Sequence, residues 1–218
     1  VVGFAFFFCY VLSSGFYDYF QFVQQWPPTN CKIRKKCSKP RPLQMFTIHG
    51  LWPSNHSNPT TPSNCNGAQF DDRKVYPRLR SKLKISWPDV ENGNDTKFWE
   101  GEWNKHGRCS EQTLNQMQYF ERSYEIWNLF NITNILKNAS IVPSATQTWT
   151  YSDIVSNIKA VTQRTPLLRC RRNPAYNKSG PNSQLLHEVV LCYGYNALKL
   201  IDCSRTPGCG NQQAISFQ

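Results

Sequence analysis

Three side chains that can handle protons and anions, Glu102, Lys105 and His106, lie within five residues of one another. In a helix, Lys105 and His106 lie three and four residues after Glu102, so all three share one side of that helix. This arrangement suits the binding of an anion. A solvated Glu–Lys pair, worth about 0.2 to 0.5 kcal/mol, explains the same spacing without any function.

A second imidazole, His49, stands in a comparable setting. It closes the apolar segment 45–49, which is typical of a strand, and it precedes Gly50 and Pro53. We therefore expect His49 at the end of a strand, where active-site loops begin. His187 lies in another strand-like segment and is interpreted as a packed or exposed strand histidine rather than a catalytic one.

Two imidazoles suit a reaction that removes one proton and donates another near neutral pH. Lys105 adds a cation for developing negative charge, and Glu102 a carboxylate that can orient or share a proton. Cleavage of RNA uses this set, because a 2'-hydroxyl must lose a proton and a departing 5' oxygen must gain one. That chemistry requires no metal and no cofactor.

The chain of 218 residues carries a net charge of +11, which favours polyanions such as nucleic acid, acidic polysaccharide or an anionic surface. A soluble cationic protein without such a partner is the alternative. The length suits one domain with a real core or two small ones. No linker, repeat or low-complexity tract is evident, so we expect a single domain over residues 16–218.

The first twelve residues carry no charge and are too few to span a bilayer, and small residues follow them. We interpret residues 1–15 as the remnant of a signal peptide, with a buried core segment as the alternative. Loss of Cys9 with that segment leaves an even number of cysteines, which argues for disulfides in a secreted protein. No CxxC pair is present, which argues against zinc. The glycosylation sequons stand at Asn55, Asn94, Asn131, Asn138 and Asn177.

Hydrophobic periodicity predicts both helices and strands. Strands are expected at 19–23, 45–49, 185–193 and 198–203, the last two forming a hairpin, with helices at 113–127 and from 152 to Pro166. Residues 31–37 and 53–68 are expected to be surface loops, the first of them basic. Because the elements do not alternate as βαβ units, the fold class is α+β, with an antiparallel central sheet and packed helices.

Two segments resemble the active-site boxes of the T-two type ribonucleases: Phe46-Thr47-Ile48-His49-Gly50-Leu51-Trp52-Pro53, and Phe98-Trp99 through Glu102-Trp103-Asn104-Lys105-His106-Gly107. Gln25-Trp26-Pro27 followed by Cys31 is similar to the amino-terminal signature of that family. Within it the chain is most similar to the S-RNases of pome-fruit plants, on its basicity, its start at 17–22 and its Pro/Ser/Asn-rich segment.

The resemblance implies roles for individual residues. His106 would be the general base and His49 the general acid, with Glu102 and Lys105 stabilising the transition state. Substrate contacts would come from Trp52, Gln25, Phe98 and Trp99. The implied disulfides join Cys31 to Cys37, Cys65 to Cys109, Cys170 to Cys209 and Cys192 to Cys203. Two positions depart from the family: Gly101 stands where many relatives have histidine, and Arg108 where threonine is common.

The leading hypothesis is a secreted, monomeric endoribonuclease with little base preference that produces 2',3'-cyclic phosphates and acts as the pistil determinant of self-incompatibility. RNA is then its substrate, F-box type pollen proteins are implied partners, and neither DNA specificity nor membrane insertion is expected. A defence or phosphate-scavenging ribonuclease and a catalytically silent, polyanion-binding glycoprotein are the alternatives.

Overall fold

The computed structural model describes residues 17–39, 42–58, 60–174, 184–204, 208–210 and 214–218. The expected signal-peptide remnant, residues 1–15, lies outside the described residues, as does the sequon at Asn177. No helix in the described ranges is long and apolar enough to cross a membrane.

A twisted sheet forms the centre of the fold, and its strands run in the order β2-β1-β5-β7-β3, with β4 and β6 also paired to β5. The strands are β1 (Tyr19–Gln25), β2 (Thr47–Ser54), β3 (Thr148–Trp149), β4 (Leu167–Arg172), β5 (Gln184–Gly194), β6 (Leu200–Ile201) and β7 (Ile215–Ser216). Their pairings are antiparallel except for the short parallel contact of β5 with β7. The predicted α+β class is confirmed.

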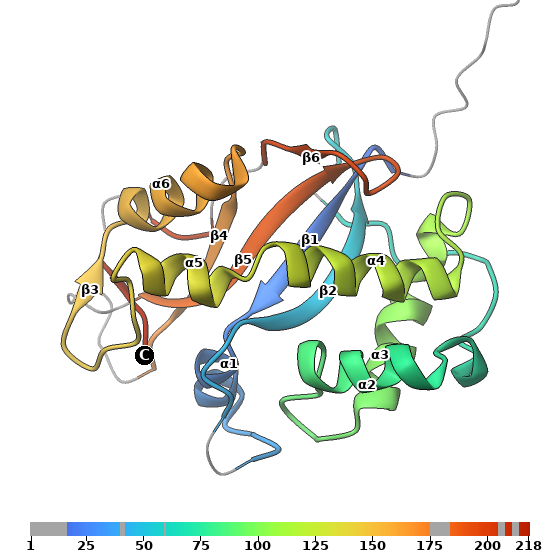
Figure 1. Cartoon of the computed structure of the whole chain (residues 1–218), viewed down its shortest axis with the longest axis horizontal. Helices are drawn as coiled ribbons and strands as arrows, with labels where there is room; N and C mark the ends of the chain where they lie inside the picture. The colour runs from blue at the N-terminus through green and yellow to red at the C-terminus, as the bar shows by residue number, and fades with distance from the viewer. Residues whose placement is uncertain (1–16, 40–41, 59, 175–183, 205–207, 211–213) are drawn as a thin grey trace, which may run out of the picture.

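Helices α4 and α5 run across one face of this sheet, and α6 lies beside β4 (Figure 1). The helices are α1 (Pro27–Arg34), α2 (Pro77–Ser86), α3 (Asp95–Lys105), α4 (Gln116–Leu129), α5 (Ile132–Asn138) and α6 (Tyr151–Thr162), with 3-10 turns η1 (Asp72–Lys74) and η2 (Gly107–Ser110). Helix α4 begins with a capping box between Asn115 and Gln118, which satisfies backbone groups that a helix start leaves free.

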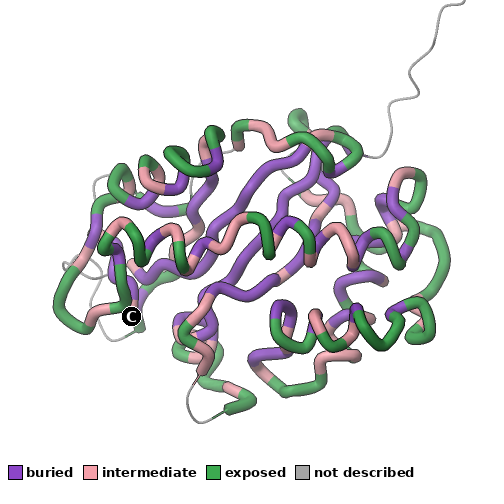
Figure 2. Tube along the Cα trace, in the orientation of Figure 1, coloured by how far each residue is buried: buried purple, intermediate pink, exposed green. Residues whose placement is uncertain are grey.

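The two faces of the sheet bury different side chains, because successive residues of a strand point to opposite sides. On the helix-covered face, Phe22, Leu51 and Leu191 join the main core. On the other face, Val23 and Val190 belong to a smaller cluster that includes half-buried Trp52. Figure 2 shows the central strands almost continuously buried.

Two β-bulges interrupt this alternation. Val23 pairs with Gly50 and Gln24 with Ile48, so His49 is an extra residue in β2. Ile48 and Leu51 both face the main core although they are three residues apart, a spacing that regular alternation forbids and that the extra residue allows. His49 lies on the opposite face, where it contacts Glu188. A second bulge makes His187 the extra residue of β5 opposite β4.

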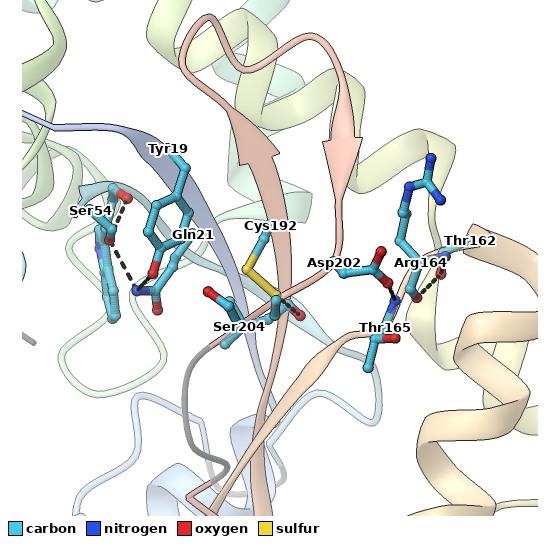
Figure 3. The surroundings of a disulfide bond; sticks show 12 residues. Tyr19, Gln21, Ser54, Thr162, Arg164, Thr165, Cys192, Asp202 and Ser204 are labelled. Atoms are coloured by element: carbon cyan, nitrogen blue, oxygen red, sulfur yellow. Dashed lines mark hydrogen bonds between the residues drawn. A yellow bond between two sulfur atoms is a disulfide. The ribbon is translucent and has the colours of Figure 1, made fainter. Parts of the chain in front are cut away.

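Four disulfides join Cys31 to Cys37, Cys65 to Cys109, Cys170 to Cys209 and Cys192 to Cys203. These are the pairs that the family resemblance implies. Figure 3 shows the last of them, which ties β5 to the segment after β6, next to the hydrogen bond from the Thr165 N–H to the Asp202 carboxylate.

Some predicted boundaries were wrong. β2 continues to Ser54 rather than ending at His49; it is the edge strand, where Pro53 breaks no ladder with a further strand. The basic loop expected at 31–37 is partly helix, because α1 begins with prolines at its first turn and ends where Lys35 adopts left-handed geometry. The helix expected at 113–127 begins later, at Gln116.

Candidate active site

A cleft of about 550 Å³ opens beside His49. It is lined by Gln25, Asn30, Ile33, Arg34, His49, Asp89, Val90, Glu91, Asn92, Lys97, Phe98, Arg171 and His187. The lining comes from β1, α1, β2, α3, β4 and β5 and from the turn before α3. The lining includes both cationic and acidic side chains, so the cleft suits a polar ligand with both donors and acceptors.

His49 is held from two sides. Its Nδ1 lies 2.6 Å from Oε1 of the buried Glu188, and its carbonyl accepts a 3.0 Å hydrogen bond from the Trp87 indole. Burial acts to lower the pKa of His49, but the hydrogen bond and negative charge of Glu188, aided by Glu102, outweigh burial and raise that pKa above 6.5. The protonated form of His49 is therefore stabilised relative to a free imidazole.

His106 has the opposite environment. It is the residue after α3, it is 5% exposed, and its Nδ1 lies 3.3 Å from the Pro62 carbonyl oxygen. Since a carbonyl only accepts, Nδ1 carries the hydrogen and Nε2 keeps a free lone pair. Burial, with smaller contributions from the charges of Lys105 and His49, lowers the pKa of His106 to about 4. His106 is neutral at physiological pH.

Trp52 lies between the two imidazoles. Its ring centroid is 5.0 Å from that of His49 and 5.2 Å from that of His106. Its indole N–H donates to Glu102 Oε2 at 2.8 Å. Glu102 is buried, and burial raises its pKa even though His49, Trp52 and Lys105 favour the charged form. Gly50 makes this contact possible, because a Cβ there would lie 2.3 Å from Glu102 Oε2.

The remaining predicted site residues differ in exposure and in their distance from the cleft. The Lys105 side chain is exposed at the end of α3, and it acts on Glu102 and His106 through its charge. Phe98 lines the cleft, with its ring 6.1 Å from that of His49. Gln25 is buried in the cleft wall, and its Nε2 has no hydrogen-bond partner among the described residues.

Trp99 is a correction to the predicted substrate contacts. It has no exposed surface, and its indole donates to the Trp87 carbonyl at 2.8 Å. A side chain without exposed surface cannot contact substrate, so Trp99 belongs to the core. Arg108 donates to the Asn104 carbonyl at the end of α3, so its guanidinium is bound to the helix terminus.

The sequons among the described residues differ in exposure. Asn94 and Asn138 are exposed, whereas Asn55 and Asn131 are partly buried. The Oδ1 atoms of Asn94 and Asn131 cap α3 and α5. Glycosylation at these positions remains a prediction.

Sequence reasoning missed two charged residues. Glu188 is 3% exposed and also accepts from Arg169 Nη1 at 3.1 Å. The Arg169 guanidinium lies 5.3 Å from the centroid of the Trp52 ring. Arg169 therefore contacts both the carboxylate partner of His49 and the indole that lies near both imidazoles. A glutamate inside a mostly apolar strand was the available signal, because a charge is buried only when it has partners. Among the described residues, no group of three or more His, Cys, Asp or Glu is placed to hold a metal.

Residues 17–203 match the model of the ribonuclease T2 family. The chain belongs to this family. This T2 family protein is 39% identical over 191 residues to Ribonuclease MC of Momordica charantia. The alignment covers 87% of this chain and 95% of that protein.

Solved structures of ribonucleases share the fold of this T2 family protein. The bitter gourd seed ribonuclease MC1 superposes with a TM-score of 0.82 at 37% identity, covering 92% of this chain and all of that one. Japanese pear S3-RNase gives a TM-score of 0.76 at 32% identity, covering 91% and 99%. The T2 family chain is thus a ribonuclease by family, with resemblance to both general and S-type plant enzymes.

Proposed function

We propose that this T2 family ribonuclease cleaves single-stranded RNA by acid–base catalysis through His106 and His49. One observation carries the proposal: the Nδ1 atoms of the two imidazoles have opposite partners. His106 binds a carbonyl oxygen and is neutral, whereas His49 binds a carboxylate and favours the charged form. A neutral base and a protonated acid can therefore coexist at one pH. A reaction in which one group accepts a proton while another donates one requires this.

In the first step, Nε2 of His106 accepts the proton of a ribose 2'-hydroxyl, and the oxygen attacks the adjacent phosphorus. The bond from phosphorus to the 5' oxygen breaks, and His49 gives its Nε2 proton to that leaving oxygen. The products are a 2',3'-cyclic phosphate and a free 5'-hydroxyl. In this mechanism Lys105 and Glu102 stabilise the charge that develops on the phosphoryl group in the transition state.

In the second step, the two histidines exchange roles. His49, now neutral, accepts a proton from water, and the hydroxyl oxygen attacks the cyclic phosphate. The 2' oxygen leaves with the proton that His106 acquired, and both imidazoles return to their starting states. DNA lacks the 2'-hydroxyl that starts this sequence, so it is not cleaved.

The cleft beside His49 is the natural place for the nucleotide on the leaving side of the scissile bond, because His49 protonates the oxygen of that nucleotide. Its lining offers Gln25 Nε2, which has no hydrogen-bond partner in the part of the chain that the structure describes, and the half-buried ring of Phe98. Variants of ribonuclease MC1 have been solved in complex with 5'-GMP and 5'-UMP, which supports nucleotide binding by this fold. Aromatic stacking tolerates any base, which favours weak base preference.

The test is cleavage of a dinucleotide and of total RNA from pH 4 to 9 by the wild type, His106→Ala and His49→Ala. We expect cyclic-phosphate products, and each variant should lose about 10²- to 10⁴-fold in kcat/KM. Circular dichroism and thermal unfolding would verify that the variants fold. A dinucleotide with 2'-deoxyribose at the cleaved position should bind without reacting.

Binding without cleavage by the folded wild type would refute the enzyme proposal and favour a polyanion-binding glycoprotein. Binding should then weaken steeply with salt, because phosphate contacts release counterions. Retention of His49, Glu102, Lys105 and His106 in one site supports the enzyme.

For the biological role, we propose a secreted pistil determinant of self-incompatibility. Similarity to Japanese pear S3-RNase and the net charge of +11 support this role, and the paired cysteines support an oxidising compartment. Relatives include both Extracellular ribonuclease LE and Intracellular ribonuclease LX of Solanum lycopersicum.

Applying the purified protein to germinating pollen tests this role. Tubes of matching haplotype should stop and other tubes should grow, with F-box type pollen proteins as the expected partners in the tolerant tubes. Equal growth in all tubes, together with transcripts that rise in leaves under phosphate starvation, would favour the defence or phosphate-scavenging alternative.

A further inference from the structure

A chain of buried and partly buried polar contacts crosses four strands behind His49. Glu188 lies on β5, flanked in the ladders by Arg169 of β4 and Gln25 of β1. Its Oε1 contacts His49 Nδ1 at 2.6 Å, and its Oε2 accepts from Arg169 Nη1 at 3.1 Å. Both carboxylate oxygens therefore have charged or polar partners, which a buried carboxylate needs.

Arg169 is itself fixed. Its Nη2 donates to the Gln21 Oε1, and its guanidinium lies 5.3 Å over the Trp52 ring. The amide nitrogen of Gln21 donates to the Tyr19 hydroxyl at 3.2 Å and to Ser54 Oγ at 3.0 Å, as Figure 3 shows. Glu188 is thus held by Arg169 of β4, which is supported in turn by residues of β1 and β2.

We propose that Glu188, held by Arg169, is the positioning residue that fixes the tautomer and the charge of His49. The carboxylate accepts the Nδ1 hydrogen, so the second hydrogen of the imidazolium is on Nε2 and is the one available to a leaving group. Glu188 contacts no substrate; it acts only through His49. This inference rests on the proposed acid role of His49 and adds the residue that maintains it.

The charges around His49 agree with this role. Glu188 from β5 and Glu102 from α3 favour the imidazolium, whereas Arg169 from β4 opposes it. His106, after α3, and His187, in β5, also interact with His49 electrostatically. The pKa of Glu188 lies well below its ordinary value, because His49, His187 and Arg169 together outweigh the cost of burial. Glu188 is therefore ionised throughout the pH range in which we expect cleavage.

The opposite signs of Glu188 and Arg169 provide a sharp test. Glu188→Gln keeps an acceptor for Nδ1 but removes the charge, and it should lower the pKa of His49 by about 1 to 3 units. Glu188→Leu removes charge and acceptor, and it should also abolish the preference for hydrogen on Nδ1. Arg169→Gln should raise the pKa of His49, because it removes an opposing positive charge.

The measurement is NMR titration of the His49 ring in full-length protein labelled with ¹³C and ¹⁵N, with ring ¹⁵N shifts reporting the tautomer. In parallel, the alkaline limb of kcat/KM should move with the His49 pKa, and the acidic limb should stay. At pH above that limb, kcat/KM should fall about tenfold for each unit moved. Glu125→Gln is the matched control, since Glu125 is an exposed glutamate paired with Arg122 on α4.

If Glu188 had only a structural role, Glu188→Gln would lower the unfolding temperature and leave the pKa of His49 unchanged. That result would overturn the proposal. The same holds if Arg169→Gln and Glu188→Gln shift the pKa in the same direction. Should Glu188→Gln not fold, Arg169→Gln tests the proposal alone. The NMR titration requires no RNA cleavage, so it separates failure of this inference from failure of the proposed ribonuclease mechanism.

Discussion

The Nδ1 atom of His106 lies 3.3 Å from the carbonyl oxygen of Pro62, a residue of the loop that Cys65 ties to Cys109. In the same loop, the Asn64 N–H donates to the Lys105 carbonyl at 2.7 Å. The Pro/Ser/Asn-rich segment is therefore bound to the end of α3 at Lys105 and at His106. Its backbone orients the proposed general base.

Removing the Cys65–Cys109 disulfide should affect both stability and activity. For the sequence separation of 44 residues, the chain-entropy model gives a loss of about 4 kcal/mol in the free energy of unfolding for Cys65→Ala with Cys109→Ala. Because Pro62 then loses its anchor, kcat/KM should also fall under conditions where the protein stays folded. Urea titration and dinucleotide cleavage measure the two effects.

The control is Cys192→Ala with Cys203→Ala, which removes a disulfide with a separation of 11 residues. It should reduce stability with little change in kcat/KM. Equal losses of activity in the two double variants would show that the loop does not orient His106.

Gly50→Ala should damage the site. The added Cβ would lie 2.1 Å from Trp52 Nε1 and 2.3 Å from Glu102 Oε2, so these side chains would have to separate. A displacement of this size costs about 100-fold in kcat/KM when it misplaces a catalytic group. Gly194→Ala, in which the new Cβ meets only the Lys199 carbonyl oxygen at 3.8 Å, should retain activity. Comparable kinetics for both variants would rule out a catalytic need for the Trp52–Glu102 contact.

Gly101→Ala should stabilise the protein. Gly101 lies in α3, and a Cβ there meets nothing within 4 Å. Alanine in a helix is favoured over glycine by about 1 kcal/mol, because glycine loses more backbone entropy. Denaturant midpoints should rise and kcat/KM should remain unchanged. Loss of activity without loss of stability would indicate that RNA uses the open space at this position.

The pH dependence of cleavage should be bell-shaped. The base must be neutral, so the rate should fall as pH drops toward the His106 pKa of about 4. The acid must be protonated, so the rate should fall again as pH rises through the His49 pKa, which lies above 6.5. Profiles of kcat/KM in wild type and Glu188→Gln measure both limbs. A flat profile over pH 4 to 9 would contradict the two-histidine mechanism.

Acid should destabilise the fold before most carboxylates titrate. Burial lowers the pKa of both His106 and His187 to about 4, so the unfolded chain binds more protons than the folded one between about pH 4 and 6.5. Their contribution to stability is complete above 6.5 and is lost as pH falls toward 4; His49, with its raised pKa, contributes in the opposite sense. Denaturant midpoints between pH 4.5 and 7 should show this fall.

His187→Asn should make that pH dependence shallower, because it removes one of the two histidines that are buried neutral. His56→Asn, which replaces an exposed histidine, serves as control. If the His187 and His56 variants both retain the wild-type slope, the acid sensitivity arises elsewhere.

Local sequence was enough for much of this protein. The spacing of Glu102, Lys105 and His106 indicated a shared helix; α3 carries Glu102 and Lys105, and His106 is the residue that follows its end. Alternating apolar residues indicated β1, and the segment around Gly194 indicated the β5–β6 pair. These features were readable because each depends on periodicity within one short segment.

Other features were decided only by tertiary structure. The sequence could not show that His49 is an extra residue in β2, since a bulge is a property of the pairing with β1. Nor could it show that Glu188 lies 2.6 Å from His49, because the two are 139 residues apart and meet only across the sheet. Trp99 shares a motif with the site residues, yet packing removed it from solvent. Residue types and spacing thus determined which chemistry was available, and strand pairing determined which imidazole holds the proton.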